Sequence, residues 1–144
     1  MVKVIISGGF DPIHIGHIRY ISESKKLGDS LVVILNSDGF LKKKKNYVFM
    51  PFKERKEIVE HIKGVDSAVR CIDKDHTVRK TLEMLCSRAG KGVKLIFAKG
   101  GDRTLKNIPE RETCERLGIK MVFGVGGRKI QSSSWLAKKH KART

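Results

Sequence analysis

The sequence predicts an α/β protein with a Rossmann-like, doubly wound, five-stranded parallel sheet and helices on both faces. Two observations support this prediction. Strand and helix patterns alternate along the chain, and the strand segments are continuous apolar runs, which are typical of parallel strands buried on both faces. The chain has 144 residues, of which 40% are hydrophobic. We therefore expect one domain over 1–144 with a core of its own, and a basic tail, 138–144, that frays.

The first strand is expected at Val2–Ser7, which is apolar and rich in β-branched residues. A helix is expected over His17–Leu27, where apolar residues recur at helical spacing and Gly28 follows as a C-cap. The apolar run Leu31–Leu35 predicts the second strand, which ends at the polar turn Asn36-Ser37-Asp38-Gly39.

The middle of the chain continues the alternation. The basic run Lys42–Lys45 is expected to form a mobile loop. A helix follows at Phe52–Ile62, with Pro51 in its first turn, because proline is favoured at the first helical positions. The next strand is expected at Ser67–Ile72 and the next helix near Thr77–Cys86.

The last part of the chain supplies two further strands and two helices. Strands are expected at Val93–Ala98 and Ile119–Val125, with a helix at Pro109–Leu117 between them. Gly118 closes that helix. A final helix is expected to begin at Ser132-Ser133-Ser134, whose hydroxyl groups suit an N-terminal cap.

The charge of the chain favours anionic ligands. The formal net charge is +16. Such an excess attracts phosphorylated metabolites, nucleic acid or an acidic membrane surface, and composition does not choose among them.

The cysteines and the hydropathy pattern predict a cytoplasmic protein. Cys71, Cys86 and Cys114 are odd in number and form no CxxC pair, which indicates thiols kept in a reducing compartment. No apolar run reaches the ~18 residues of a membrane span, and the first residues show no signal-peptide pattern.

The most informative segment is Gly8-Gly9-Phe10-Asp11-Pro12-Ile13-His14-Ile15-Gly16-His17, between the first strand and its helix. Glycines let a backbone approach phosphate, and a helix N-terminus offers unpaired N–H groups. His14 and His17 lie three residues apart on one face, so both imidazoles can reach phosphate oxygens, and Gly16 leaves room between them. The segment therefore predicts a nucleoside triphosphate site. Because ligands of open α/β sheets bind at the carboxyl ends of the strands, we expect the polar turns after the strands to share this site.

This segment resembles the signature of the cytidylyltransferase-like nucleotidyltransferases in its GxFD turn and its HxGH tetrapeptide. The resemblance extends along nearly the whole chain, through Asn36-Ser37-Asp38, Arg55, Gly64-Val65-Asp66 and Ala98-Lys99-Gly100-Gly101-Asp102. Within the family, the chain is most similar to the branch of glycerol-3-phosphate cytidylyltransferases and heptose-1-phosphate adenylyltransferases.

The resemblance implies an enzyme that transfers a nucleoside monophosphate from ATP or CTP to a small phosphorylated polyol or sugar, with release of pyrophosphate. It also implies a homodimer, and Mg²⁺ to neutralise the triphosphate. Two alternatives stay open. One is a coenzyme adenylyltransferase that acts on a phosphopantetheine, nicotinamide or flavin precursor. The other is a module without catalysis that binds nucleic acid through its basic surface.

By resemblance, the catalytic residues are His14, His17, Lys44 and Arg55. A guanidinium can grip phosphate bidentately from an ordered helix, and the alternative for Arg55 is an exposed helix arginine. The acceptor is expected at Asp38 and Lys44. For Asp11, ordering the turn and contacting substrate or metal stay open. The residues expected to bind the nucleotide are Gly8, Gly9, Phe10, Asp11, Gly16, Lys99, Gly100, Asp102, Arg128, Ser132, Ser133 and Ser134.

The chain departs from the family pattern shortly before the expected final helix. The family has an arginine and then a glycine ahead of its hydroxyl residues. Here Ile130 replaces the glycine, and the arginine is displaced by one place to Arg128. Either Arg128 or Lys129 is expected to replace the family arginine.

Overall fold

The computed structural model describes residues 1–101 and 108–126, and within them it forms one parallel sheet. The strand order is β3-β2-β1-β4-β5. The five strands are β1 Val2–Gly8, β2 Ser30–Leu35, β3 Ser67–Arg70, β4 Lys94–Gly100 and β5 Lys120–Val125. The predicted five-stranded parallel sheet is confirmed.

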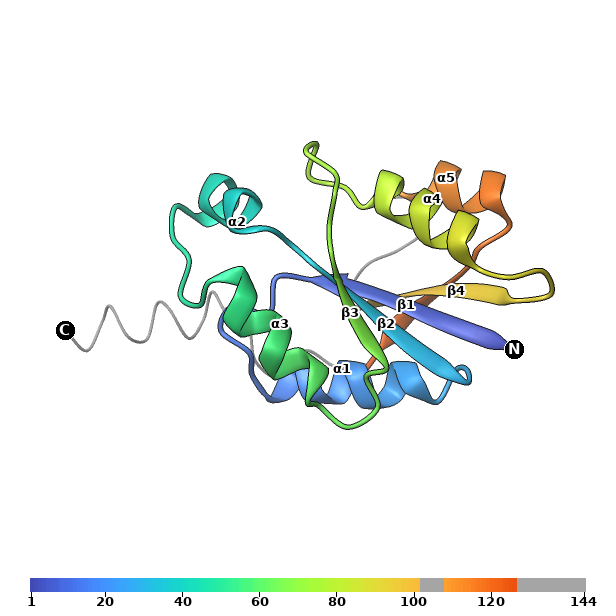
Figure 1. The fold of residues 1–144 in the computed structure, drawn as a ribbon, viewed down its shortest axis with the longest axis horizontal. Coiled ribbons are helices and arrows are strands. Elements are labelled where there is room, and N and C mark those ends of the chain that lie inside the picture. The colour runs from blue at the N-terminus through green and yellow to red at the C-terminus, as the bar shows by residue number, and fades with distance from the viewer. Residues whose placement is uncertain (102–107, 127–144) are drawn as a thin grey trace.

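Helices cover both faces of this sheet (Figure 1). The helices are α1 Ile15–Lys25, α2 Asp38–Lys45, α3 Phe52–Glu60, α4 Arg79–Arg88 and α5 Arg111–Leu117. Helices α1 and α3 lie on one face and α4 and α5 on the other, while α2 follows the carboxyl end of β2. The winding direction changes between β1 and β4, which are neighbours in the sheet, so the predicted doubly wound arrangement is confirmed.

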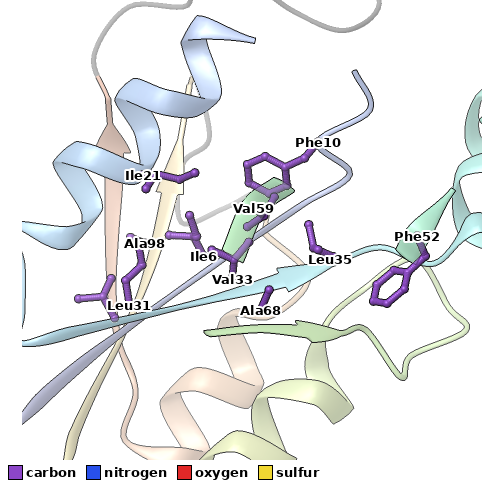
Figure 2. Close-up of a cluster of buried hydrophobic side chains, with 11 residues drawn as sticks. Ile6, Phe10, Ile21, Leu31, Val33, Leu35, Phe52, Val59, Ala68 and Ala98 are labelled. Atoms are coloured by element: carbon purple, nitrogen blue, oxygen red, sulfur yellow. The ribbon is translucent and has the colours of Figure 1, made fainter. Parts of the chain in front are cut away.

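The two faces of the sheet bury separate apolar clusters. In β1, Val4 and Ile6 point to the α1 and α3 face, whereas Ile5 points to the α4 and α5 face, and all three are fully buried. Figure 2 shows the first cluster, in which Ile21 of α1 and Val59 of α3 pack over the sheet. A strand buried on both faces needs apolar residues at every position, which explains the continuous apolar runs.

The lysine run is helical, so its prediction as a mobile loop is wrong. The Ser37 hydroxyl accepts a hydrogen bond from the Phe40 N–H at 3.1 Å and caps α2. Leu41 is buried beneath the helix, and Asn46 ends it in the left-handed conformation, with φ 65°. Lysines also suit the negative end of the helix dipole. The lysine run thus belongs to a helix that Ser37 caps and that Leu41 anchors through its buried side chain.

Several predicted ends are also wrong. Helix α1 ends in a right-handed turn at Lys26, and Gly28 is not its cap. A Cβ at Gly28 would lie 2.7 Å from the carbonyl oxygen of Val2, so this glycine permits a close backbone approach. Pro51 is the N-cap of α3 and not a first-turn residue. Helix α4 begins at Arg79 and not at Thr77. The Thr77 hydroxyl accepts the N–H of Arg79, and the Asp73 carboxylate accepts the N–H groups of Lys80 and Thr81.

Two further findings bear on the sequence predictions. No helix in residues 1–101 and 108–126 is long and apolar enough to cross a membrane. The cysteines Cys71, Cys86 and Cys114 are free, as expected. The predicted final helix from Ser132 and the basic tail, 138–144, lie outside the described residues.

Candidate active site

In the turn after β1, the glycines and Phe10 pack closely against other parts of the chain. Phe10 adopts a positive φ of 52°, and its ring is 2% exposed within the first core cluster. A Cβ at Gly8 would lie 3.1 Å from this ring, and one at Gly9 would lie 2.9 Å from Leu41 of α2. The glycines therefore let Phe10 and α2 pack against the turn. The ring of Phe10 belongs to the core, and the expectation that Phe10 contacts the nucleotide stays a prediction.

The two histidines of the turn form a stacked pair at the start of α1. His14 is the N-cap, and its Nδ1 accepts the Gly16 N–H at 3.0 Å. The Nδ1 of His17 accepts the His14 N–H at 3.2 Å, and the two ring centroids are 3.9 Å apart. A ring nitrogen that accepts an N–H carries no proton. Both neutral rings therefore carry their proton on Nε2, as hydrogen-bond donors.

The surroundings of His17 keep it neutral. Burial is the largest cause, and the neighbouring His14 and Lys45 add to it, so that the pKa of His17 falls from 6.5 to about 3. The ring of Phe10, whose centroid is 4.5 Å from that of His17, contributes to this burial. At neutral pH His17 is thus an uncharged hydrogen-bond donor in this structure.

The structure brings Lys45, and not Lys44, to the histidines. The Lys45 ammonium donates to the main-chain oxygen of Asp11 at 2.5 Å and lies 3.5 Å from its carboxylate. Lys44 is exposed, with its ammonium 5.7 Å from the Phe40 ring centroid. The role expected of Lys44 stays a prediction, and the structure adds Lys45 as the lysine that lies beside the histidines. Neighbouring residues of a helix differ by about 100° in direction, which only the helical form of α2 could reveal.

Asp11 orders the loop that joins α2 to α3. Its side chain is buried, and its two carboxylate oxygens accept the N–H groups of Phe49, at 2.8 Å, and Met50, at 2.6 Å. Of the two roles left open for Asp11, this geometry favours the ordering of the turn.

Arg55 joins the segments that surround the site. Its side chain is fully buried, and its guanidinium donates to the carbonyl oxygens of three residues and to one carboxylate. These partners are Met50 at 2.9 Å, Gly9 at 2.9 Å, Asn36 at 2.8 Å and the Asp38 carboxylate at 2.7 Å. The alternative of an exposed helix arginine is wrong. The guanidinium holds the ends of β1 and β2, α2 and the entry to α3 together in this structure.

The spacing of α3 held a signal for this buried position. Arg55 lies three residues after Phe52 and four before Val59, which are both buried on the same face of the helix. An arginine in the apolar stripe of a helix is expected to be buried and to need several acceptors.

The other predicted residues lie around the same edge of the sheet. Asp38 opens α2, and its carboxylate is 41% exposed although it pairs with Arg55. Lys99 lies at the end of β4, with its ammonium 5.1 Å from the ring centroid of Phe97, on the face covered by α4 and α5. The remaining predicted residues, Asp102, Arg128, Lys129, Ser132, Ser133 and Ser134, lie outside the described residues.

Sequence reasoning missed Tyr20, which connects α1 to the ends of β4 and β5. Its hydroxyl donates to the Ala98 carbonyl oxygen at 2.5 Å. A Cβ at Gly100 would lie 3.4 Å from its ring, and one at Gly126 would lie 3.1 Å from its Cα. The helix that begins with the histidines is therefore packed against both strand ends.

Comparisons with known proteins identify the relatives of this chain. A model of the family described as cytidylyltransferase-like matches residues 5–140. An FAD synthase from Ferroglobus placidus is 44% identical over 120 residues, which cover 83% of this chain and 72% of that protein. The glycerol-3-phosphate cytidylyltransferase of Bacillus subtilis is 41% identical over 131 residues, which cover 91% of this chain and 95% of that protein.

The fold is shared with solved structures. A lipopolysaccharide core biosynthesis protein from Thermoplasma volcanium superposes with a TM-score of 0.68 at 28% identity, over 85% of this chain and 95% of that one.

Proposed function

This chain belongs to the cytidylyltransferase-like family and is a nucleotidyltransferase, and we propose that it transfers AMP from ATP to the phosphate of FMN, releasing pyrophosphate. The observation that carries the proposed chemistry is the stacked His14–His17 pair, with both ring protons on Nε2 and with Lys45 beside it. The flavin acceptor rests on the similarity to FAD synthases.

A second acceptor is supported by a separate observation. The similarity to the glycerol-3-phosphate cytidylyltransferase spans nearly the full length of both proteins. Transfer of CMP from CTP to glycerol 3-phosphate is therefore the second candidate, and the same phosphate-binding residues serve both reactions.

The proposed reaction is a substitution at the α-phosphorus. An oxygen of the acceptor phosphate forms the new P–O bond, and the bond to the bridging oxygen breaks, so that pyrophosphate leaves with the electron pair. Such a reaction needs positioning and stabilisation of charge more than covalent catalysis. The Nε2–H groups of His14 and His17 and the Lys45 ammonium supply hydrogen bonds and charge to the phosphate oxygens. No proton leaves these groups in this scheme.

Lys45 is suited to exchange partners during binding. Its ammonium is held by one carbonyl and by a carboxylate 3.5 Å away. Burial lowers its pKa more than the contact with the Asp11 carboxylate raises it. A triphosphate beside the histidines would provide further negative charge, while Asp11 would stay bound to the loop N–H groups.

Mg²⁺ belongs to the proposal as part of the nucleotide substrate. In residues 1–101 and 108–126, no three His, Cys, Asp or Glu side chains gather to hold a metal ion. Mg²⁺ commonly keeps several waters and binds through substrate phosphates, so the triphosphate would supply most of the ligands that are not water.

The experiment is a pyrophosphate-release assay that crosses ATP and CTP with FMN and glycerol 3-phosphate in the presence of Mg²⁺. We expect turnover with ATP and FMN. His14→Ala and His17→Ala are each expected to lower kcat about 10²- to 10³-fold, as is typical when one donor to the transition state is lost. His61→Ala, which changes an exposed histidine of α3's C-terminal end, is the matched control.

The outcomes separate the candidates. Turnover only with CTP and glycerol 3-phosphate would replace the first candidate by the second. No turnover with any pair, together with salt-dependent binding of RNA that survives both histidine substitutions, would favour the nucleic-acid alternative. The expected homodimer is a further proposal, which the molar mass in solution tests.

A further inference from the structure

The loop between α2 and α3 presents an exposed aromatic side chain on a fixed backbone. Phe49 is 47% exposed. A single exposed apolar residue is ordinary on a protein surface, but this one lies in a loop that is bound to the active-site turn. Its N–H donates to Asp11 at 2.8 Å, and the next N–H, of Met50, does so at 2.6 Å. The ring is therefore offered to solvent from a defined position.

A second aromatic residue supports this ring. The rings of Tyr47 and Phe49 meet edge to face, with their centroids 5.0 Å apart and their planes at 76°. Edge-to-face contact is a favourable arrangement of aromatic rings. We call Tyr47 and Phe49 the aromatic pair.

The aromatic pair is continuous with the phosphate-binding residues. The Lys45 ammonium lies 5.0 Å from the Tyr47 ring centroid and 3.5 Å from the Asp11 carboxylate. The same ammonium is close enough to His17 to lower its pKa. A molecule whose phosphate lies at Lys45 and the histidines can thus extend along the chain's own surface to the aromatic pair.

We propose that the aromatic pair is the stacking surface for the ring of the acceptor, so that the acceptor is a phosphomonoester with a planar aromatic group. An exposed aromatic face stabilises planar rings by stacking, and it offers no comparable contact to the short polar chain of glycerol. The ribityl chain of FMN separates a phosphate from such a ring. The inference rests on the proposed function, because it assigns the acceptor of that same site.

The test compares Phe49→Leu, which keeps an apolar side chain without a ring, with Phe49→Trp, which keeps a ring. Ile58→Ala changes an apolar residue of α3 that is 37% exposed and is the matched control. In steady-state assays with ATP and FMN, we expect Phe49→Leu to raise the KM for FMN about 5- to 150-fold, the range for loss of one stacked ring, and to leave the KM for ATP unchanged. Phe49→Trp should restore the KM for FMN.

Direct binding of riboflavin, which has the ring but no phosphate, provides a readout that does not depend on turnover. Its absorbance and fluorescence change on stacking, and we expect this change with the wild type and Phe49→Trp but not with Phe49→Leu. Thermal unfolding checks that all variants are folded.

Each outcome decides the inference. An unchanged KM for FMN in Phe49→Leu would overturn it while the proposed function stands. A raised KM for ATP alone would overturn it in favour of a nucleotide-base contact. If the wild type uses only glycerol 3-phosphate, the proposed flavin acceptor is wrong. If riboflavin also fails to bind, the inference that the aromatic pair is a stacking surface is overturned as well. A change of molar mass in Phe49→Leu would overturn it in favour of an interface between copies of the chain.

Discussion

Replacement of Arg55 by methionine tests whether this residue holds the active-site segments together. Methionine keeps most of the side-chain length and removes all donors of the guanidinium. In the structure these donors serve the carbonyl oxygens of Gly9, Asn36 and Met50. The Asp38 carboxylate, which is 41% exposed, can be hydrated in the variant.

The expected magnitude follows from these partners. A buried polar group without a partner costs about 1–3 kcal/mol, so three partly buried carbonyls cost about 3 kcal/mol at the lower limit. The ion pair with Asp38 adds little, because exposed pairs contribute about 0–1 kcal/mol. For a chain of this size, a loss of about 3 kcal/mol corresponds to a decrease of about 10 °C in Tm.

The assay is urea unfolding followed by circular dichroism, with thermal unfolding as a second measurement. Arg79→Met is the matched control, because Arg79 is half-exposed and pairs with exposed Asp75 at 2.9 Å. We expect this control to lose less than about 1 kcal/mol. If Arg55→Met is no less stable than Arg79→Met but binds ATP more weakly, Arg55 acts on the ligand and our reasoning about its structural role is refuted.

Three further predictions concern the same region. Burial lowers the pKa of His17 to about 3 in the folded chain, against 6.5 in the unfolded chain, so the unfolded chain takes up the proton first. Stability should therefore fall as the pH decreases from about 6.5 towards 3. In urea unfolding between those pH values, His17→Gln should flatten this dependence. Lys45→Ala should weaken ATP binding, measured by calorimetry, about 10- to 100-fold through loss of a charged hydrogen bond. Lys44→Ala, which changes an exposed lysine, should change the affinity less than about twofold. Equal effects of the two substitutions would contradict the placement of Lys45 beside the nucleotide. Gly28→Ala should lower the free energy of unfolding by about 1–3 kcal/mol, because the new Cβ would lie 2.7 Å from the carbonyl oxygen of Val2. Gly39→Ala, at an open helical position, should raise it by up to about 1 kcal/mol in the same unfolding assay.

The fold was predictable because its signals are local. The continuous apolar residues of β1 and β2 identify parallel strands buried on both faces, and Gly118 marks the end of α5, where it adopts a φ of 70°. Helix α2 was not predictable from charge alone. Its stability depends on the cap from Ser37 and on burial of Leu41, whose side chain lies against Gly9 of the turn after β1.

The residues of the site were predicted better than their roles. His14 and His17 were placed at the start of a helix by their spacing, and the structure brings them together as a stacked pair. Lys45 was included in the expected lysine run but was not chosen, because its selection depends on the direction of each side chain around α2. Residue types near a motif thus indicate which groups are available and do not indicate where each one points.

The sequence by itself determined the parallel α/β architecture and the histidine turn, because strand burial and helix starts depend on residues adjacent in the chain. Only the tertiary structure decided which segments Arg55 and Asp11 join and where Phe49 lies. Arg55 and Asp11 satisfy backbone groups 19 and 39 residues away in the chain, and Phe49 is placed by such a bond. Hydrogen bonds of this kind depend on how distant segments meet, which no local pattern records.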